Sequence, residues 1–138
     1  MKKLIIAIVV FLPTVLAFAQ NKEKLDRPGE IARGKYFVER VALCVECHTP
    51  RDSSGRLLRG KYLEGAPVPV KSPSYANMKW ALRAPAIVGL PGYTAEQGIR
   101  LLTEGITADG RRPNPPMPPF RFSRADAEAI VAYLKSLE

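Results

Sequence analysis

The feature that most constrains this chain is a run of five residues, Cys44-Val45-Glu46-Cys47-His48. The run contains both cysteines and the one histidine of the whole sequence. On a helical turn, residues three positions apart lie on one face, so both thiols can reach the same planar group. The pattern C-x-x-C-H is typical of c-type haem attachment. It predicts one haem c, bound covalently through Cys44 and Cys47, with its iron ligated by His48.

Three other chemistries use closely spaced cysteines. A structural zinc site needs about four ligands, and a Cys/His centre cannot be assembled from two cysteines and one histidine. A thioredoxin-like dithiol would follow a strand in a βαβ pattern, whereas the pattern before Cys44 is helical. A plain disulfide would leave His48 unexplained. The haem prediction is therefore preferred over these three.

The second axial ligand of the iron cannot be a histidine, because His48 is already used. Met117 lies in the proline-rich segment 113–120, and prolines make such a segment stiff and non-helical. A stiff strap can hold a thioether over the haem, so we expect Met117 to be the ligand. Met78, in a polar stretch, is the alternative. The segment also fits a partner-binding tract or a connector.

Residues 1–19 are typical of a secretory signal peptide, because two lysines precede an apolar run that ends with alanines at positions 17 and 19. We expect removal of this segment and a periplasmic location. The alternative is an uncleaved N-terminal membrane anchor, although the apolar run is short for a span of about 20 residues. No later segment has the composition of a membrane span, and residues 20–29 are expected to form a flexible linker.

Hydrophobic periodicity predicts three helices, over residues 30–43, residues 94–104 and from residue 123 onward. Thr94 and Gln97 resemble a capping box, and Ser123 is a good N-cap residue. The chain has 13 prolines and 10 glycines, so we expect long irregular connections. The longest is residues 49–84, where a short hairpin around residues 56–70 is one possibility.

The chain resembles a class I, mono-haem cytochrome c domain in four features and in their order. These are the helix with Gly34, the Cys44–His48 motif, the Met117 strap and the ending Tyr133-Leu134-Lys135-Ser136-Leu137. The likeness covers residues 30–138. It implies an all-α cytochrome c fold, with three to four helices around one covalently bound haem and long Pro- and Gly-rich loops. In that family the first and last helices cross closely, with a glycine on one and an aromatic residue on the other. Gly34 and Tyr133 match this arrangement.

A later segment is similar to the family's Gly-Pro-x-Leu-x-Gly-Leu segment. It reads Ala84-Pro85-Ala86-Ile87-Val88-Gly89-Leu90. There the proline carbonyl accepts a hydrogen bond from the proximal imidazole. The resemblance implies that Pro85 orients His48 and belongs to the cofactor-binding residues. The segment lies further from the haem motif than in short mitochondrial-type cytochromes, and Gly34 lies two residues further from the first cysteine. This spacing is closer to the cytochrome modules that serve bacterial sugar and alcohol dehydrogenases.

The expected function is the transfer of single electrons between redox partners, because no acid–base pair or nucleophile points to an enzyme. One possibility is a free, monomeric shuttle. The alternative is a tightly bound cytochrome subunit of a periplasmic dehydrogenase complex, in which the loop at 49–84 would be a docking surface. A haem sensor or peroxidase would require an open sixth position on the iron.

The formal net charge is +8. Basic residues follow the haem motif and flank the Met117 strap, and they would steer an acidic redox partner. A merely solubilising surface explains them equally well. Nucleic acid is not an expected partner of an exported haem protein.

Overall fold

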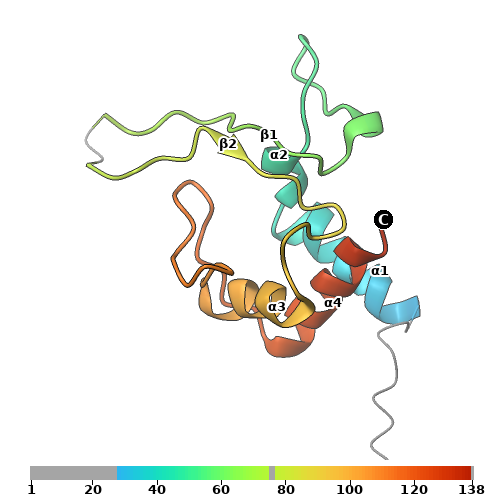
Figure 1. Cartoon of the computed structure of the whole chain (residues 1–138). Coiled ribbons are helices and arrows are strands. Elements are labelled where there is room, and N and C mark those ends of the chain that lie inside the picture. Colours follow the sequence, from blue (N-terminus) through green and yellow to red (C-terminus); the bar gives the residue numbers. More distant parts are fainter. Residues whose placement is uncertain (1–27, 75–76, 138) are drawn as a thin grey trace, which may run out of the picture.

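The structure is a computed structural model that describes residues 28–74 and 77–137, so the expected signal peptide and most of the expected linker lie outside the described residues. The elements in chain order are α1 (Pro28–Tyr36), the π-helix η1 (Phe37–Val41), α2 (Cys44–His48), the 3-10 helix η2 (Arg59–Lys61), β1 (Ala66–Pro67), β2 (Arg83–Ala84), α3 (Ala95–Glu104) and α4 (Arg124–Lys135). Helices dominate and the strands are short, as the sequence predicts (Figure 1). Within the described ranges, no helix has the length and apolar character needed to span a membrane.

The first and last helices cross closely at Gly34. A Cβ atom added there would lie 2.6 Å from the carbonyl carbon of Ala129 and 2.7 Å from the Cβ of Tyr133. Only a glycine lets the two backbones approach this closely, which confirms the crossing expected from Gly34 and Tyr133. Arg33 adds a tie between the helices, because its Nε donates to the Asp126 carboxylate at 2.9 Å.

The helix expected over residues 30–43 is interrupted before its end. It is α-helical as far as Tyr36 and continues as a π-helix, in which the Ala42 N–H donates to the Phe37 carbonyl at 2.8 Å. Leu43 then takes a left-handed conformation with φ 52°. A π turn holds one residue more than an α turn, so the interruption turns the following residues to a new direction. The predicted helix is therefore present as far as Val41, but it ends two residues earlier than expected and its last turn is π-helical.

The two later helices begin where their caps predict. The Gln97 N–H donates to Thr94 Oγ1 at 3.2 Å, and the Thr94 N–H donates to the Gln97 side chain at 2.9 Å. The Asp126 N–H donates to Ser123 Oγ at 3.2 Å. Both caps satisfy helix N–H groups that have no partner within the helix. These predictions are confirmed.

The hydrophobic core lies where α4 meets α1, the π-helix and α3. Seven residues of α4 are buried, and α3 packs so closely on α4 that a Cβ on Gly98 would lie 3.0 Å from Val131 Cγ2. Val38 and Leu63 are also fully buried in this core. The core thus holds the helices together and anchors the loop that carries Leu63.

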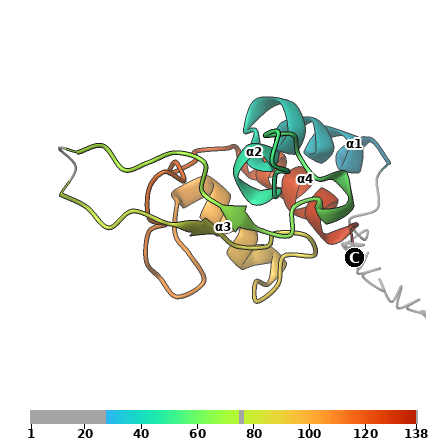
Figure 2. The same ribbon diagram turned by 90° about the horizontal axis from the view of Figure 1, so that it is seen from above.

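A long arm, formed by residues 67–74 and 77–83, projects from the helices, and both views show it (Figures 1 and 2). Its base is the antiparallel pairing of Ala66 with Ala84 and of Pro67 with Arg83. The hairpin suggested around residues 56–70 is not present. The chain just before that segment turns back on itself instead, because an antiparallel bridge joins Arg51 to Leu57.

The close crossing generates a stability prediction. Replacing Gly34 with Ala forces the two helices apart, and this overpacking outweighs the better helix propensity of Ala. We expect the free energy of unfolding to fall by about 3 kcal/mol, measured by urea denaturation of the haem-loaded protein. Gly29→Ala is the matched control in the same helix, because a Cβ at Gly29 meets nothing within 4 Å. An equal loss in both variants would contradict the account.

Candidate haem site

The helix α2 places the side chains of the motif on different sides. Cys44, Cys47 and His48 are three and four positions apart, so they share one face of the helical turn. Val45 and Thr49 point into the protein and are 6% and 1% exposed. Both cysteines are half-buried and neither forms a disulfide. Two free thiols and an imidazole are therefore available together on one turn.

The imidazole of His48 is held by the carbonyl of Pro85, which lies 2.7 Å from its Nδ1. A carbonyl oxygen only accepts hydrogen bonds, so Nδ1 carries the proton and Nε2 keeps its lone pair. Among the described residues, Nε2 has no hydrogen-bond partner. This is the tautomer that a metal-binding histidine needs, with the other nitrogen bonded to a carbonyl. The side chain fits an axial ligand of haem iron.

The ionisation of His48 agrees with this geometry. Burial lowers the pKa of the imidazole, and the Pro85 carbonyl offsets part of that effect because it stabilises the protonated ring. The ring is therefore neutral at neutral pH. A neutral imidazole is the form that binds iron.

The carbonyl of Pro85 is positioned by a segment that the sequence did not single out. Gly65 donates to the His48 carbonyl at 2.7 Å, and the carbonyl of Leu63 accepts from the Ile87 N–H at 2.9 Å. The Leu63 N–H donates to the buried hydroxyl of Thr49 at 3.0 Å. These bonds fasten the loop both to α2 and to the chain around Pro85.

Gly65 also touches the Pro85 segment directly. Its φ is +85°, and a Cβ there would lie 2.8 Å from the carbonyl carbon of Pro85 and 2.7 Å from the Ala86 nitrogen. The fold requires glycine here for conformation and for space. One glycine in a Gly- and Pro-rich loop gives no sequence signal of this contact, which is why it was missed.

The surroundings of the cysteines favour neither a reactive dithiol nor a zinc site. Burial raises the pKa of Cys44 to about 11, and the neighbouring Cys47 adds to the shift. Reactive dithiols need a lowered pKa, because the thiolate is the nucleophile. In the part of the chain that the structure describes, no group of three or more His, Cys, Asp or Glu side chains is placed to hold a metal ion.

The two candidate methionine ligands lie in different surroundings. Met117 is half-buried in the strap, while Met78 is on the arm and is 55% exposed. The strap is held within and just after its length, because the Ala81 N–H donates to the Pro115 carbonyl at 2.7 Å and the Phe122 N–H donates to the Leu102 carbonyl at 3.1 Å. These two hydrogen bonds restrain the strap, which suits a methionine whose thioether must stay in place as a ligand. Ligation by Met117 stays a prediction.

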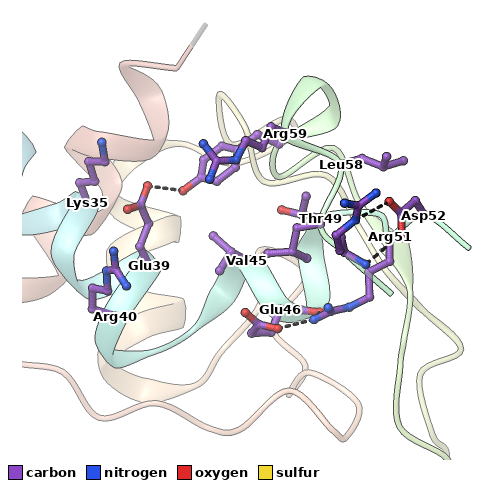
Figure 3. A pocket seen from close by; sticks show the side chains of 13 residues that line it. Lys35, Glu39, Arg40, Val45, Glu46, Thr49, Arg51, Asp52, Leu58 and Arg59 are labelled. Atoms are coloured by element: carbon purple, nitrogen blue, oxygen red, sulfur yellow. Dashed lines mark hydrogen bonds and ion pairs between the residues drawn. The ribbon is translucent and has the colours of Figure 1, made fainter. Parts of the chain in front are cut away.

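A pocket of about 1090 Å³ lies behind α2 (Figure 3). Val45, Glu46 and Thr49 line it, whereas Cys44, Cys47 and His48 do not. Its walls are held by polar contacts, such as the Tyr62 hydroxyl donating to Glu39 at 2.7 Å and the ion pair of Arg51 with Glu46. The pocket is therefore on the opposite side of α2 from Cys44, Cys47 and His48.

Comparison with known proteins agrees with this geometry. The family model "Cytochrome c" matches residues 31–138. The fructose dehydrogenase cytochrome subunit of Gluconobacter japonicus is 34% identical over 111 residues, which are 76% of this chain and 21% of the relative. A diheme cytochrome c-type protein of Cereibacter sphaeroides is 31% identical over 115 residues, which are 80% of this chain and 36% of the relative.

The chain therefore belongs to the cytochrome c family. Family membership confirms the all-α cytochrome c fold class and implies a covalently bound haem with its iron and a role in electron transfer. The chain spans only about a fifth and a third of the length of these two relatives.

The contact between Gly65 and the Pro85 segment predicts that a substitution at Gly65 changes the reduction potential. Gly65→Ala displaces the Pro85 carbonyl, weakens its hydrogen bond to His48 and makes the imidazole a less basic ligand. A less basic ligand stabilises ferric iron less, so the reduction potential rises by tens of millivolts, measured by redox titration.

Gly55→Ala is the matched control for backbone strain. Gly55 has φ +83°, close to that of Gly65, but a Cβ there meets nothing within 4 Å. Both substitutions cost about 1 kcal/mol of stability through left-handed strain. The potential of the Gly55 variant stays at the wild-type value. Equal shifts in the two variants would refute a role of Gly65 in positioning Pro85.

Proposed function

We propose that this chain carries single electrons between redox partners through one haem, which Cys44 and Cys47 attach and which His48 and Met117 ligate. The haem supplies the reversible one-electron couple when it is bound. The chain itself is assigned no catalytic reaction. The observation that carries the proposal is the hydrogen bond from His48 to the Pro85 carbonyl, beside two free cysteines on the same helical turn.

The side chains around the site limit rearrangement during electron transfer. His48 is 8% exposed, and its ring orientation is set by Pro85. The proposed Met117 ligand lies in a proline-rich strap whose backbone has little freedom to lose. Because both ligands are held in place by the protein, a change of oxidation state requires no ligand to leave. This arrangement favours electron transfer over ligand sensing or peroxide chemistry, which require an open sixth position.

A second candidate is a cytochrome subunit bound tightly to a dehydrogenase. The observation in its favour is the similarity to the fructose dehydrogenase cytochrome subunit. Purification from the native organism separates the two candidates, because a subunit remains with a larger enzyme in high salt while a shuttle elutes as a monomer.

Export to the periplasm is part of the proposal. It rests on residues 1–19, in which two lysines precede an apolar run and small residues. N-terminal sequencing of the purified protein checks it. A first residue at Gln20 supports cleavage, and an intact N-terminus supports a membrane anchor.

The ligand assignment predicts a spectroscopic difference between two methionine variants. In Met117→Ala the ferric protein loses the weak long-wavelength band of the iron–methionine sulfur bond, and its reduction potential falls because the thioether no longer favours ferrous iron. In Met78→Ala, the control, the band stays. Absorption spectra of both oxidised variants make the measurement. Loss of the band only in Met78→Ala would reverse the assignment, and a five-coordinate spectrum of the wild type would move the protein towards sensing or peroxide chemistry.

A further inference from the structure

The arm lies outside the hydrophobic core of the described chain. We define the arm as residues 67–74 and 77–83, which extend from the β1–β2 pairing and project away from the helices (Figures 1 and 2). The Val68 N–H donates to the Leu82 carbonyl at 3.0 Å, and Trp80 Nε1 donates to the Val70 carbonyl at 3.2 Å. Three prolines stiffen the first half of the arm, residues 67–74. The arm is thus a preorganised ribbon.

The arm carries large apolar side chains that are exposed. The paired strands end at Pro67 and Arg83, and the arm beyond them carries three large apolar side chains, those of Val70, Met78 and Leu82. These three side chains are 50%, 55% and 81% exposed, in the order Val70, Met78 and Leu82. Large apolar side chains gathered on a projecting element are typical of an interaction surface.

The charge of the ribbon has one sign only. Residues 65–95 contain no Asp or Glu, while the arm carries Lys71, Lys79 and Arg83. None of these three cations forms an ion pair within the described residues, although seven ion pairs occur elsewhere in them. Each cation directly follows one of the three exposed apolar residues in the sequence. The long stems of lysine and arginine let the charges extend away from these apolar side chains.

The arm is also connected to the strap that carries the proposed iron ligand. The Ala81 N–H donates to the Pro115 carbonyl at 2.7 Å, two residues before Met117. An occupant of the arm therefore lies beside the Met117 strap. Electron transfer weakens steeply with distance, so this is a useful place for a redox partner to bind.

We propose that the arm is the docking element for a redox partner protein whose surface has an apolar centre bordered by carboxylates. Such a surface matches the exposed apolar side chains of the arm and the cations next to them, and protein interfaces usually combine an apolar core with a polar rim. The inference rests on the proposed function and adds the chemistry of the partner. A second copy of this chain is a poor occupant, because two arms of the same positive charge repel each other.

The test uses the haem-loaded full-length protein and a surface of defined chemistry. Gold is coated with a mixed monolayer of carboxylate- and methyl-terminated thiols, and adsorption is measured by surface plasmon resonance at low ionic strength. The double variant Lys71→Glu/Lys79→Glu weakens adsorption on the order of tenfold. The matched control, Lys35→Glu/Arg59→Glu, makes the same change in net charge on exposed residues away from the arm and weakens it less than about twofold.

A third variant tests the apolar contribution. Val70→Ser weakens adsorption to the mixed monolayer but not to a monolayer of carboxylates alone. Adsorption of the arm variants equal to that of the Lys35/Arg59 control would overturn the proposal. So would tighter binding of the wild type to vesicles of phosphatidylserine and phosphatidylcholine than to the monolayer, since the occupant would then be a membrane.

The failure of this inference is distinguishable from failure of the proposed function. The absorption spectrum of each variant is recorded before and after chemical reduction. A c-type spectrum that cycles normally, together with unchanged adsorption of the arm variants, refutes the docking role alone. A wild-type protein without a reversible c-type spectrum refutes the proposed function, whatever the adsorption shows.

Discussion

The hydrogen bond between the His48 imidazole and the Pro85 carbonyl is the interaction on which the arrangement of the site depends. It sets the tautomer of the one histidine and holds the ring at 2.7 Å from a backbone atom. It also joins two segments that are 37 residues apart in the sequence. The loop through Leu63 and Gly65 supports both partners of this bond, so the long connection after the motif is part of the site and not merely a link between helices.

The helices support this hydrogen bond indirectly, through the hydrophobic core. The crossing of α1 and α4 at Gly34 builds the core, and the fully buried Leu63 fixes the loop to that core. The Gly89 N–H donates to the Leu134 carbonyl at 2.9 Å, which ties the segment after Pro85 to the end of α4. Packing of the helices thus determines where the imidazole and its carbonyl partner meet.

The sequence predicted the helical fold class, the caps at Thr94 and Ser123 and the close crossing at Gly34, because each depends on local chemistry or on a recognisable pattern. It did not predict the π turn over residues 37–41 or the left-handed conformation of Leu43 that follows it. Nothing in the residues there favours a left-handed conformation. The arm and the role of Gly65 were also missed. Both depend on pairings between distant segments, and one glycine in a loop rich in glycine does not reveal which backbone it approaches.

The proposed function requires one haem attached covalently to this chain through the motif that contains Cys44 and Cys47. The most direct test is the intact mass of the purified protein after acid–acetone extraction, followed by mass analysis of its proteolytic peptides. We expect a mass increase of one haem that survives extraction and maps to the peptide containing both cysteines. A haem that is removed by extraction, or a polypeptide mass with no haem on it, would contradict the account.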